Sequence, residues 1–260
     1  MCFRNCWILL LIVLVIEKNS YAFDFPGEFA QNPSGSLALS GLPGFRSTPA
    51  RFSEPGFGVS YAQVSETEIH VVSAAGEMGW GRETLGFRTA FFSSYMAMDS
   101  IYRQVYSEID ASVFGTWYVV GFGYGLSVNW IPAEEEWTEN RYKLGSAVLW
   151  RPLALSGMLV WNQAPNMLEV GYGVSIRAEV AERFYSFFEY DGESFDIGTA
   201  VRFKFMTIRS AYRFPEFGVV CSVEFALGGV NVSGTYGFVG QIWDWFGGNI
   251  SKSVRKKTIL

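Results

Sequence analysis

Side chains of opposite character alternate along most of the chain after residue 56, and the clearest case is LEVGYGVSIRA at residues 168–178. Apolar or aromatic side chains fill its even-numbered positions up to 176, whereas glycine, serine or a charge fills the odd-numbered ones. Successive side chains of a β-strand point to opposite faces, so this pattern predicts a strand with one apolar and one polar face. A soluble protein buries the apolar face, but a membrane barrel turns it to lipid.

The same alternation recurs and predicts about fourteen strands of about ten residues each. That length matches a tilted membrane-spanning strand and exceeds the five or six residues usual in a globular sheet. We therefore expect an all-β fold, an antiparallel transmembrane β-barrel of about 12–14 strands. The expected strands span residues 56–64, 66–75, 83–93, 104–116, 118–130, 141–151, 153–162, 167–178, 182–190, 194–204, 206–214, 217–227, 229–237 and 241–251.

The second face of these strands combines glycine with isolated charges. Glycine weakens a strand interior, so its repeated use at Gly121, Gly123 and Gly125 fits a barrel interior where the facing space is small. A face turned to water would carry more Lys, Glu and Thr than this one, which is largely Gly, Ala and Ser. We therefore expect this face to line a lumen. The charged residues expected there are Arg88, Glu169, Arg177, Asp196, Arg202, Lys204, Arg209, Arg213 and Glu224.

Composition agrees with a surface that faces lipid. Charged residues make up 17% of the chain, below the roughly 25% of a typical soluble domain. Aromatic residues also make up 17%, and four tryptophans stand near the ends of expected strands, where membrane barrels carry aromatic girdles. These are Trp117, Trp130, Trp150 and Trp161.

The first residues resemble a secretory signal peptide. Arg4 precedes an apolar run at residues 7–16, and Ser20, Tyr21 and Ala22 form a small-x-small cleavage site. We expect residues 1–22 to be removed, residues 23–55 to form a leader or plug-like segment, residues 56–251 to form the barrel, and residues 252–260 to form a basic tail. The expected location is the outer membrane of a Gram-negative bacterium, with outer-membrane lipid and the barrel-assembly machinery as partners.

Nothing in the sequence indicates catalysis, a cofactor or a metal. His70 is the single histidine, which leaves little for zinc ligation or a Ser-His-Asp arrangement. The acidic run at residues 134–136 lacks the ligand spacing of a calcium loop. The net charge of −5 is mild and spread out, and the one basic cluster is the C-terminal tail, so the sequence gives no sign of nucleic-acid binding. We expect the longer connection at 131–140 to face outside, and the tight connections at 190–193 and 214–216 to face the periplasm.

Residues 23–55 do not alternate and contain Asn32, Pro33 and Gly35, with Ser34 between the last two. The first expected strand then carries Gly58-Val59-Ser60-Tyr61. This order of parts resembles the long-chain fatty-acid transporter (FadL-like) superfamily, including the related PorV-type barrels, in which an Asn-Pro-Ala-Gly-Leu-like motif precedes a barrel of about fourteen strands. The resemblance implies an N-terminal segment that gates the barrel, with Asn32, Pro33 and Gly35 in the gate.

Three functions follow from these features. The first is an outer-membrane barrel that passes a small or hydrophobic solute. The second is a non-conducting accessory or scaffold barrel for secretion or envelope organisation, with a lumen filled by pairs of arginine and carboxylate. The third is a soluble secreted β-sandwich that acts as a binding module. An enzyme is not expected.

Overall fold

A computed structural model describes residues 48–50, 56–64, 69–80, 82–96, 100–130, 137–165, 167–190, 192, 195–215, 218–239 and 243–253. The predicted signal peptide, the gate residues Asn32, Pro33 and Gly35, and the end of the basic tail lie outside them. The strands are β1 (Gly56–Val64), β2 (Ile69–Trp80), β3 (Glu83–Met96), β4 (Ser100–Phe114), β5 (Tyr118–Trp130), β6 (Trp137–Trp150), β7 (Leu153–Ala164), β8 (Met167–Ala181), β9 (Phe184–Tyr190), β10 (Phe195–Arg202), β11 (Met206–Phe214), β12 (Gly218–Leu227), β13 (Val230–Val239) and β14 (Trp243–Ser253).

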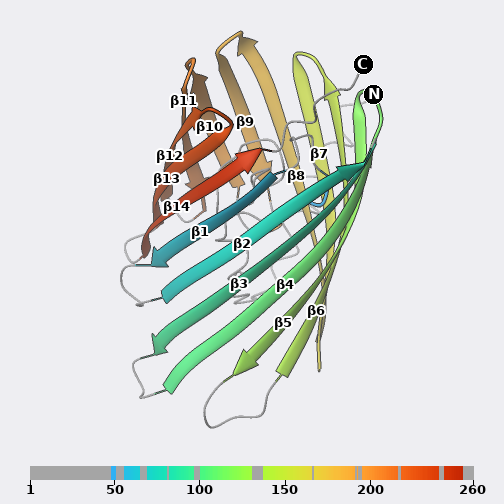
Figure 1. The fold of residues 1–260 in the computed structure, drawn as a ribbon, viewed down its shortest axis with the longest axis vertical. Coiled ribbons are helices and arrows are strands. Elements are labelled where there is room, and N and C mark those ends of the chain that lie inside the picture. The colour runs from blue at the N-terminus through green and yellow to red at the C-terminus, as the bar shows by residue number, and fades with distance from the viewer. Residues whose placement is uncertain are drawn as a thin grey trace, which may run out of the picture.

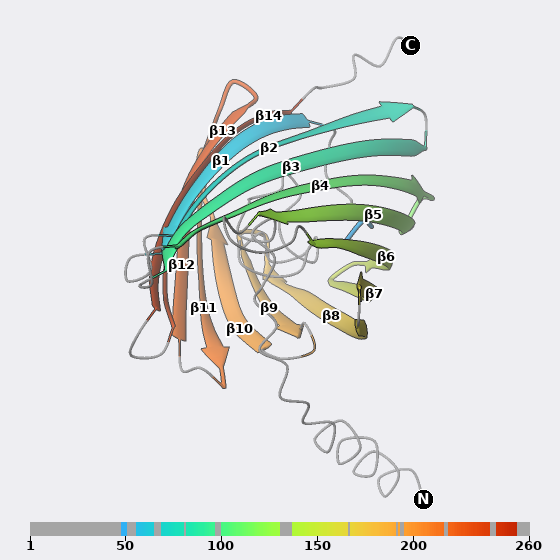
Figure 2. The ribbon, with the colours of Figure 1, turned by 90° about the horizontal axis from the view of Figure 1, so that it is seen from below.

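The fourteen strands form one closed antiparallel barrel (Figures 1 and 2). Each strand pairs with its neighbours in the chain, and β1 closes the sheet against β14, with Gly56 opposite Ser253 and Val64 opposite Trp245. Closure pairs the backbone of every strand on both sides, which is the requirement for a sheet that spans a membrane. The prediction of an antiparallel barrel of about 12–14 strands is confirmed.

Strand length differs between the two halves of the barrel. β2 to β8 contain 12–15 residues, whereas β9 to β13 contain 7–10. Fifteen residues of strand extend about 50 Å, or about 35 Å across the bilayer at a tilt near 45°. The typical length of about ten residues is therefore too short for most of β2 to β8, which can reach past the hydrocarbon core, although the range 118–130 expected for one strand matches β5.

The connections between strands lie at two rims. Those after even-numbered strands are short; Arg151 and Pro152, for example, join β6 to β7, and Glu182 and Arg183 join β8 to β9. The expected external loop after β5 and the expected periplasmic turns after β9 and β11 all follow odd-numbered strands. Because neighbouring strands are antiparallel, these three connections lie at the same rim. The prediction that the loop and the two turns lie at opposite rims is wrong. The prediction assigned each connection to a rim by its length, but short and long connections both follow odd-numbered strands.

The apolar face of the sheet is the outer one. In β8 the side chains of Leu168, Val170 and Val174 are 70%, 60% and 41% exposed, whereas Ser175 is 0% exposed. The same alternation follows β5, where Val120 and Phe122 are exposed and Val119 and Gly121 are buried. This arrangement is that of a membrane-spanning barrel and excludes the soluble β-sandwich.

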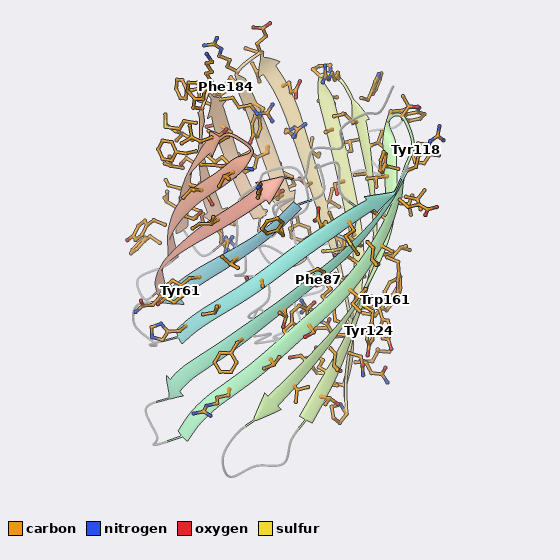
Figure 3. The ribbon with its side chains drawn as sticks, viewed as in Figure 1. Tyr61, Phe87, Tyr118, Tyr124, Trp161 and Phe184 are labelled. Carbon is orange, nitrogen blue, oxygen red and sulfur yellow. The ribbon has the colours of Figure 1, made fainter. Side chains whose placement is uncertain are left out.

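Exposed aromatic side chains, among them Tyr61, Phe87, Tyr118 and Tyr124, lie on the outer face at several heights of the barrel (Figure 3). Tyr118 lies near the upper rim of that view, at the start of β5, and Tyr61 and Tyr124 lie lower on the wall. Trp117 and Trp150, both beside connections of one rim, are 59% and 75% exposed. Aromatic rings that expose their apolar body and a polar tip suit the two membrane interfaces. The side chain of Trp130 lies outside the described residues, and that of Trp161 is half-buried.

Within the described residues, no helix is long and apolar enough to span a membrane.

Candidate functional site in the barrel interior

The inner face of β4, β5 and β6 carries a buried ion pair. Lys143 Nζ lies 3.1 Å from Glu108 Oε2, both side chains are 1% exposed, and the Tyr106 hydroxyl donates a hydrogen bond to the same carboxylate oxygen. The pair spans β5 at Gly123, where an added Cβ would lie 3.2 Å from Glu108 Oε1 and 3.5 Å from Lys143 Cβ. A buried charge is costly unless it is paired, so glycine here leaves the room that the pair needs.

A second group of polar contacts lies on the inner face of β8 to β11. Arg213 Nε donates to Asp196 Oδ1 at 3.2 Å, and Asp196 is 0% exposed. The Ser175 hydroxyl donates to Glu189 Oε1 at 3.0 Å, and Glu189 is also 0% exposed. The pair of Arg213 and Asp196 compensates charge inside the barrel, as Lys143 and Glu108 do, and the Ser175 hydroxyl satisfies one oxygen of Glu189.

Three arginines of the predicted lumen set converge on Tyr185, near the rim of the short turns. The guanidinium carbons of Arg177 and Arg202 lie 5.5 and 4.7 Å from the centre of the Tyr185 ring. Arg209 Nε donates to the Tyr185 hydroxyl at 3.3 Å, and Arg209 Nη2 pairs with Glu224 Oε2 at 2.6 Å. Tyr185 is 3% exposed, so its ring forms the floor of this arginine cluster.

Two further predicted lumen residues, Glu169 and Lys204, lie apart from these groups. Glu169 is half-buried near the opposite end of β8, and Lys204 is exposed in the bend after β10, with Nζ 5.0 Å from the centre of the Phe205 ring. The Arg88 side chain lies outside the described residues; its backbone pairs with Ala75 and Glu108, which are both buried. The structure thus joins Asp196 to Arg213, and joins Arg177, Arg202, Arg209 and Glu224 around Tyr185.

Several polar residues of the barrel interior were not predicted from the sequence. They are Tyr106, Glu108, Asp110, Arg141, Lys143 and Glu189, all of which are buried. Arg141 and Lys143 alternate with Tyr142 and Leu144, so the period-two pattern already placed them on the face of Gly145. Their alternate positions along the strands are enough to assign these residues to the inner face, as they were for Asp196.

Part of the predicted N-terminal segment lies against the inner wall. Thr48 and Ala50 are 1% and 0% exposed, and Ala50 packs with Val119 of β5 and Ala147 of β6. An added Cβ at Gly145 would overlap the Thr48 hydroxyl, and one at Gly121 would overlap the Pro49 carbonyl. Glycine at these two positions therefore makes the space that residues 48–50 occupy.

The described residues contain no group of three or more His, Cys, Asp or Glu side chains arranged to hold a metal ion.

No protein-family model and no curated protein matches the sequence. Many solved structures are similar in fold. Among them are a TodX deltaS2S3 mutant monoaromatic hydrocarbon channel (TM-score 0.61, 10% identity, 87% of this chain and 100% of that chain covered), the CymD monoaromatic hydrocarbon channel (0.58, 10%, 78% and 88%) and the Ralstonia pickettii toluene transporter TbuX (0.58, 9%, 86% and 92%).

The chain shares the fold of these channels. The resemblance inferred from the order of parts is confirmed at the level of the barrel. At about one residue in ten identical, the likeness concerns architecture, and the function has to come from this chain's own residues.

Proposed function

We propose that the protein is a barrel of the Gram-negative outer membrane that passes a small hydrophobic solute. One observation carries the proposal: the closed sheet turns its apolar face outward and holds buried ion pairs inside, Lys143 with Glu108 and Arg213 with Asp196. Such a molecule needs lipid around it and provides a protected interior across the bilayer. The similar channels, described as monoaromatic hydrocarbon and toluene transporters, supply the solute class.

The N-terminal segment is the proposed gate. Residues 48–50 occupy the inner wall at Gly121 and Gly145, so the chain before β1 enters the barrel interior. Movement of this segment would change the free cross-section, whereas the barrel wall would stay fixed by its backbone pairing. The residues Asn32, Pro33 and Gly35 belong to the same proposed gate by the sequence resemblance.

A non-conducting accessory barrel is the second candidate function. The buried pairs of Lys143 with Glu108 and of Arg213 with Asp196 favour it, because paired charges and residues 48–50 take up interior space. This function requires an envelope partner but no solute path.

Solute uptake separates the two functions. A Gram-negative host that lacks hydrocarbon channels would make the full-length chain, and uptake of radiolabelled toluene would be compared with that of the same host carrying the empty vector. Fractionation and the mobility of unheated against heated samples on a gel would establish folded barrel in the outer membrane. Faster uptake with folded barrel supports transport; unchanged uptake at equal barrel levels overturns it in favour of the accessory function.

A further inference from the structure

The arginine cluster around Tyr185 carries more positive than negative charge. Its three guanidinium groups, from Arg177, Arg202 and Arg209, face two carboxylates, Glu179 at 3.7 Å from Arg177 and Glu224 at 2.6 Å from Arg209. Arg202 contacts the Tyr185 ring and has no carboxylate within salt-bridge distance among the described residues. A hydrocarbon offers nothing that these groups recognise.

Arg177 has unused hydrogen-bonding capacity. Its Nε is buried without a hydrogen-bond partner within the described part of the chain, and its contact with Glu179 is long for a charge-assisted hydrogen bond. Burying a guanidinium nitrogen without a partner is costly, so the position favours an anion that would accept its hydrogen.

The cluster is reachable from the rim of the short turns. Arg202 is the last residue of β10 and is exposed, while the Arg177 and Arg209 side chains keep 16% and 13% of their surface. Buried aromatic rings support the cluster from beneath: Phe187, 3% exposed, lies 6.2 Å between ring centroids from Tyr185. A guanidinium group matches a carboxylate in geometry, and its flat face can also stack on an aromatic ring of a ligand. The exposed guanidinium of Arg202 therefore suits a ligand that carries both groups.

We propose that Arg177, Arg202 and Arg209 form a binding site for aromatic carboxylates at the short-turn mouth of the barrel interior. Arg202 and Arg177 bind the carboxylate, and Arg209, held by Tyr185 and Glu224, adds positive potential behind them. The site goes beyond hydrocarbon passage because it recognises a charge. It would concentrate anionic aromatic solutes at this mouth whether or not neutral ones cross.

Benzoate and benzamide test the site directly, because they share size and aromatic body and differ in charge. Calorimetry on the detergent-extracted full chain should show benzoate binding at least about tenfold more tightly than benzamide, since hydrogen bonds to charged groups are worth more than neutral ones. Arg177→Gln with Arg202→Gln should weaken benzoate binding at least about tenfold and leave benzamide unchanged. Arg177→Lys with Arg202→Lys should weaken benzoate binding less than the glutamine variant does. Lysine keeps the positive charge, but it lacks the planar guanidinium group that can bind a carboxylate through two hydrogen bonds.

Arg183→Gln is the matched control. Arg183 lies in the exposed turn between β8 and β9, at the same rim and with the same charge, and it contributes only its backbone carbonyl, which accepts a hydrogen bond from Arg202 N. Unheated gel mobility would verify that each variant is a folded barrel. Equal affinity for benzoate and benzamide, equal affinity of wild type and the double glutamine variant, or an equal loss in Arg183→Gln overturns the proposal. Absence of toluene uptake together with selective benzoate binding would overturn the transport function and leave the site intact.

Discussion

Lys143 of β6 and Glu108 of β4 form a salt bridge of 3.1 Å over the intervening strand β5, with both side chains 1% exposed. The bridge passes over Gly123, whose missing side chain leaves the space. Side chains thereby join β4 and β6 across β5, which pairs with both strands through its backbone. The interior contact therefore explains a glycine in the middle of a strand, where glycine otherwise weakens the sheet.

Removing one partner of this pair should destabilise the barrel strongly. Lys143→Met leaves the Glu108 carboxylate without its ammonium partner in a buried place, at an expected cost of about 3–5 kcal/mol in the free energy of unfolding. Adding Glu108→Gln removes the uncompensated charge and should recover much of that loss. Urea unfolding of the protein in lipid vesicles measures both variants and Glu108→Gln alone. If the loss of stability in the double variant equals the sum of the losses in Lys143→Met and Glu108→Gln, the two residues do not interact.

An arginine on the outer face should cost more at mid-strand than at the strand end. Val174 is near the middle of β8 and Leu168 near its start; both are exposed on the same face. Val174→Arg should lower the free energy of unfolding by about 2–4 kcal/mol, whereas Leu168→Arg should lower it by about 0–1 kcal/mol, because the cost falls towards the membrane interface. Equal costs in vesicles would contradict a lipid-facing Val174.

A larger residue at Gly145 should displace residues 48–50 from the inner wall. Gly145→Val would put a side chain where the Thr48 hydroxyl lies, and conductance in planar bilayers should rise if this segment closes the path. Gly157→Val is the control on neighbouring β7, because an added Cβ there meets nothing nearer than the Gly173 carbonyl oxygen at 3.9 Å. Conductance that rises equally in both variants, or in neither, would argue against a gate at this position.

The sequence pattern predicted architecture well because period two is a direct consequence of strand geometry. It placed Asp196 and Arg213 on one face, and the structure pairs them across β10 and β11. It could not predict the arginine cluster, because Arg177, Arg202 and Arg209 come from three strands and meet only through register and strand tilt. It ended the second expected strand at residue 75, although β2 continues through Gly76 and Gly79 to Trp80; small residues on both faces hid the alternation.

The contact of residues 48–50 with β5 and β6 was equally out of reach of local pattern. Gly121 was predicted to face a small space, but nothing in the sequence identified Pro49 as what fills it. Residues 48–50 belong to a segment without alternation, so no local sequence pattern indicates which distant strands they contact.

The most direct test concerns which face of residues 168–177 meets lipid. Nitroxide labels would be placed one at a time along this segment, on cysteines introduced into a Cys221→Ser background, and accessibility to oxygen in the bilayer would be compared with accessibility to a water-soluble relaxation agent. The account predicts oxygen maxima at 168, 170, 172, 174 and 176, the positions of the exposed apolar side chains. Oxygen maxima at the odd-numbered positions, or water contact at the even-numbered ones, would contradict a lipid-facing apolar wall.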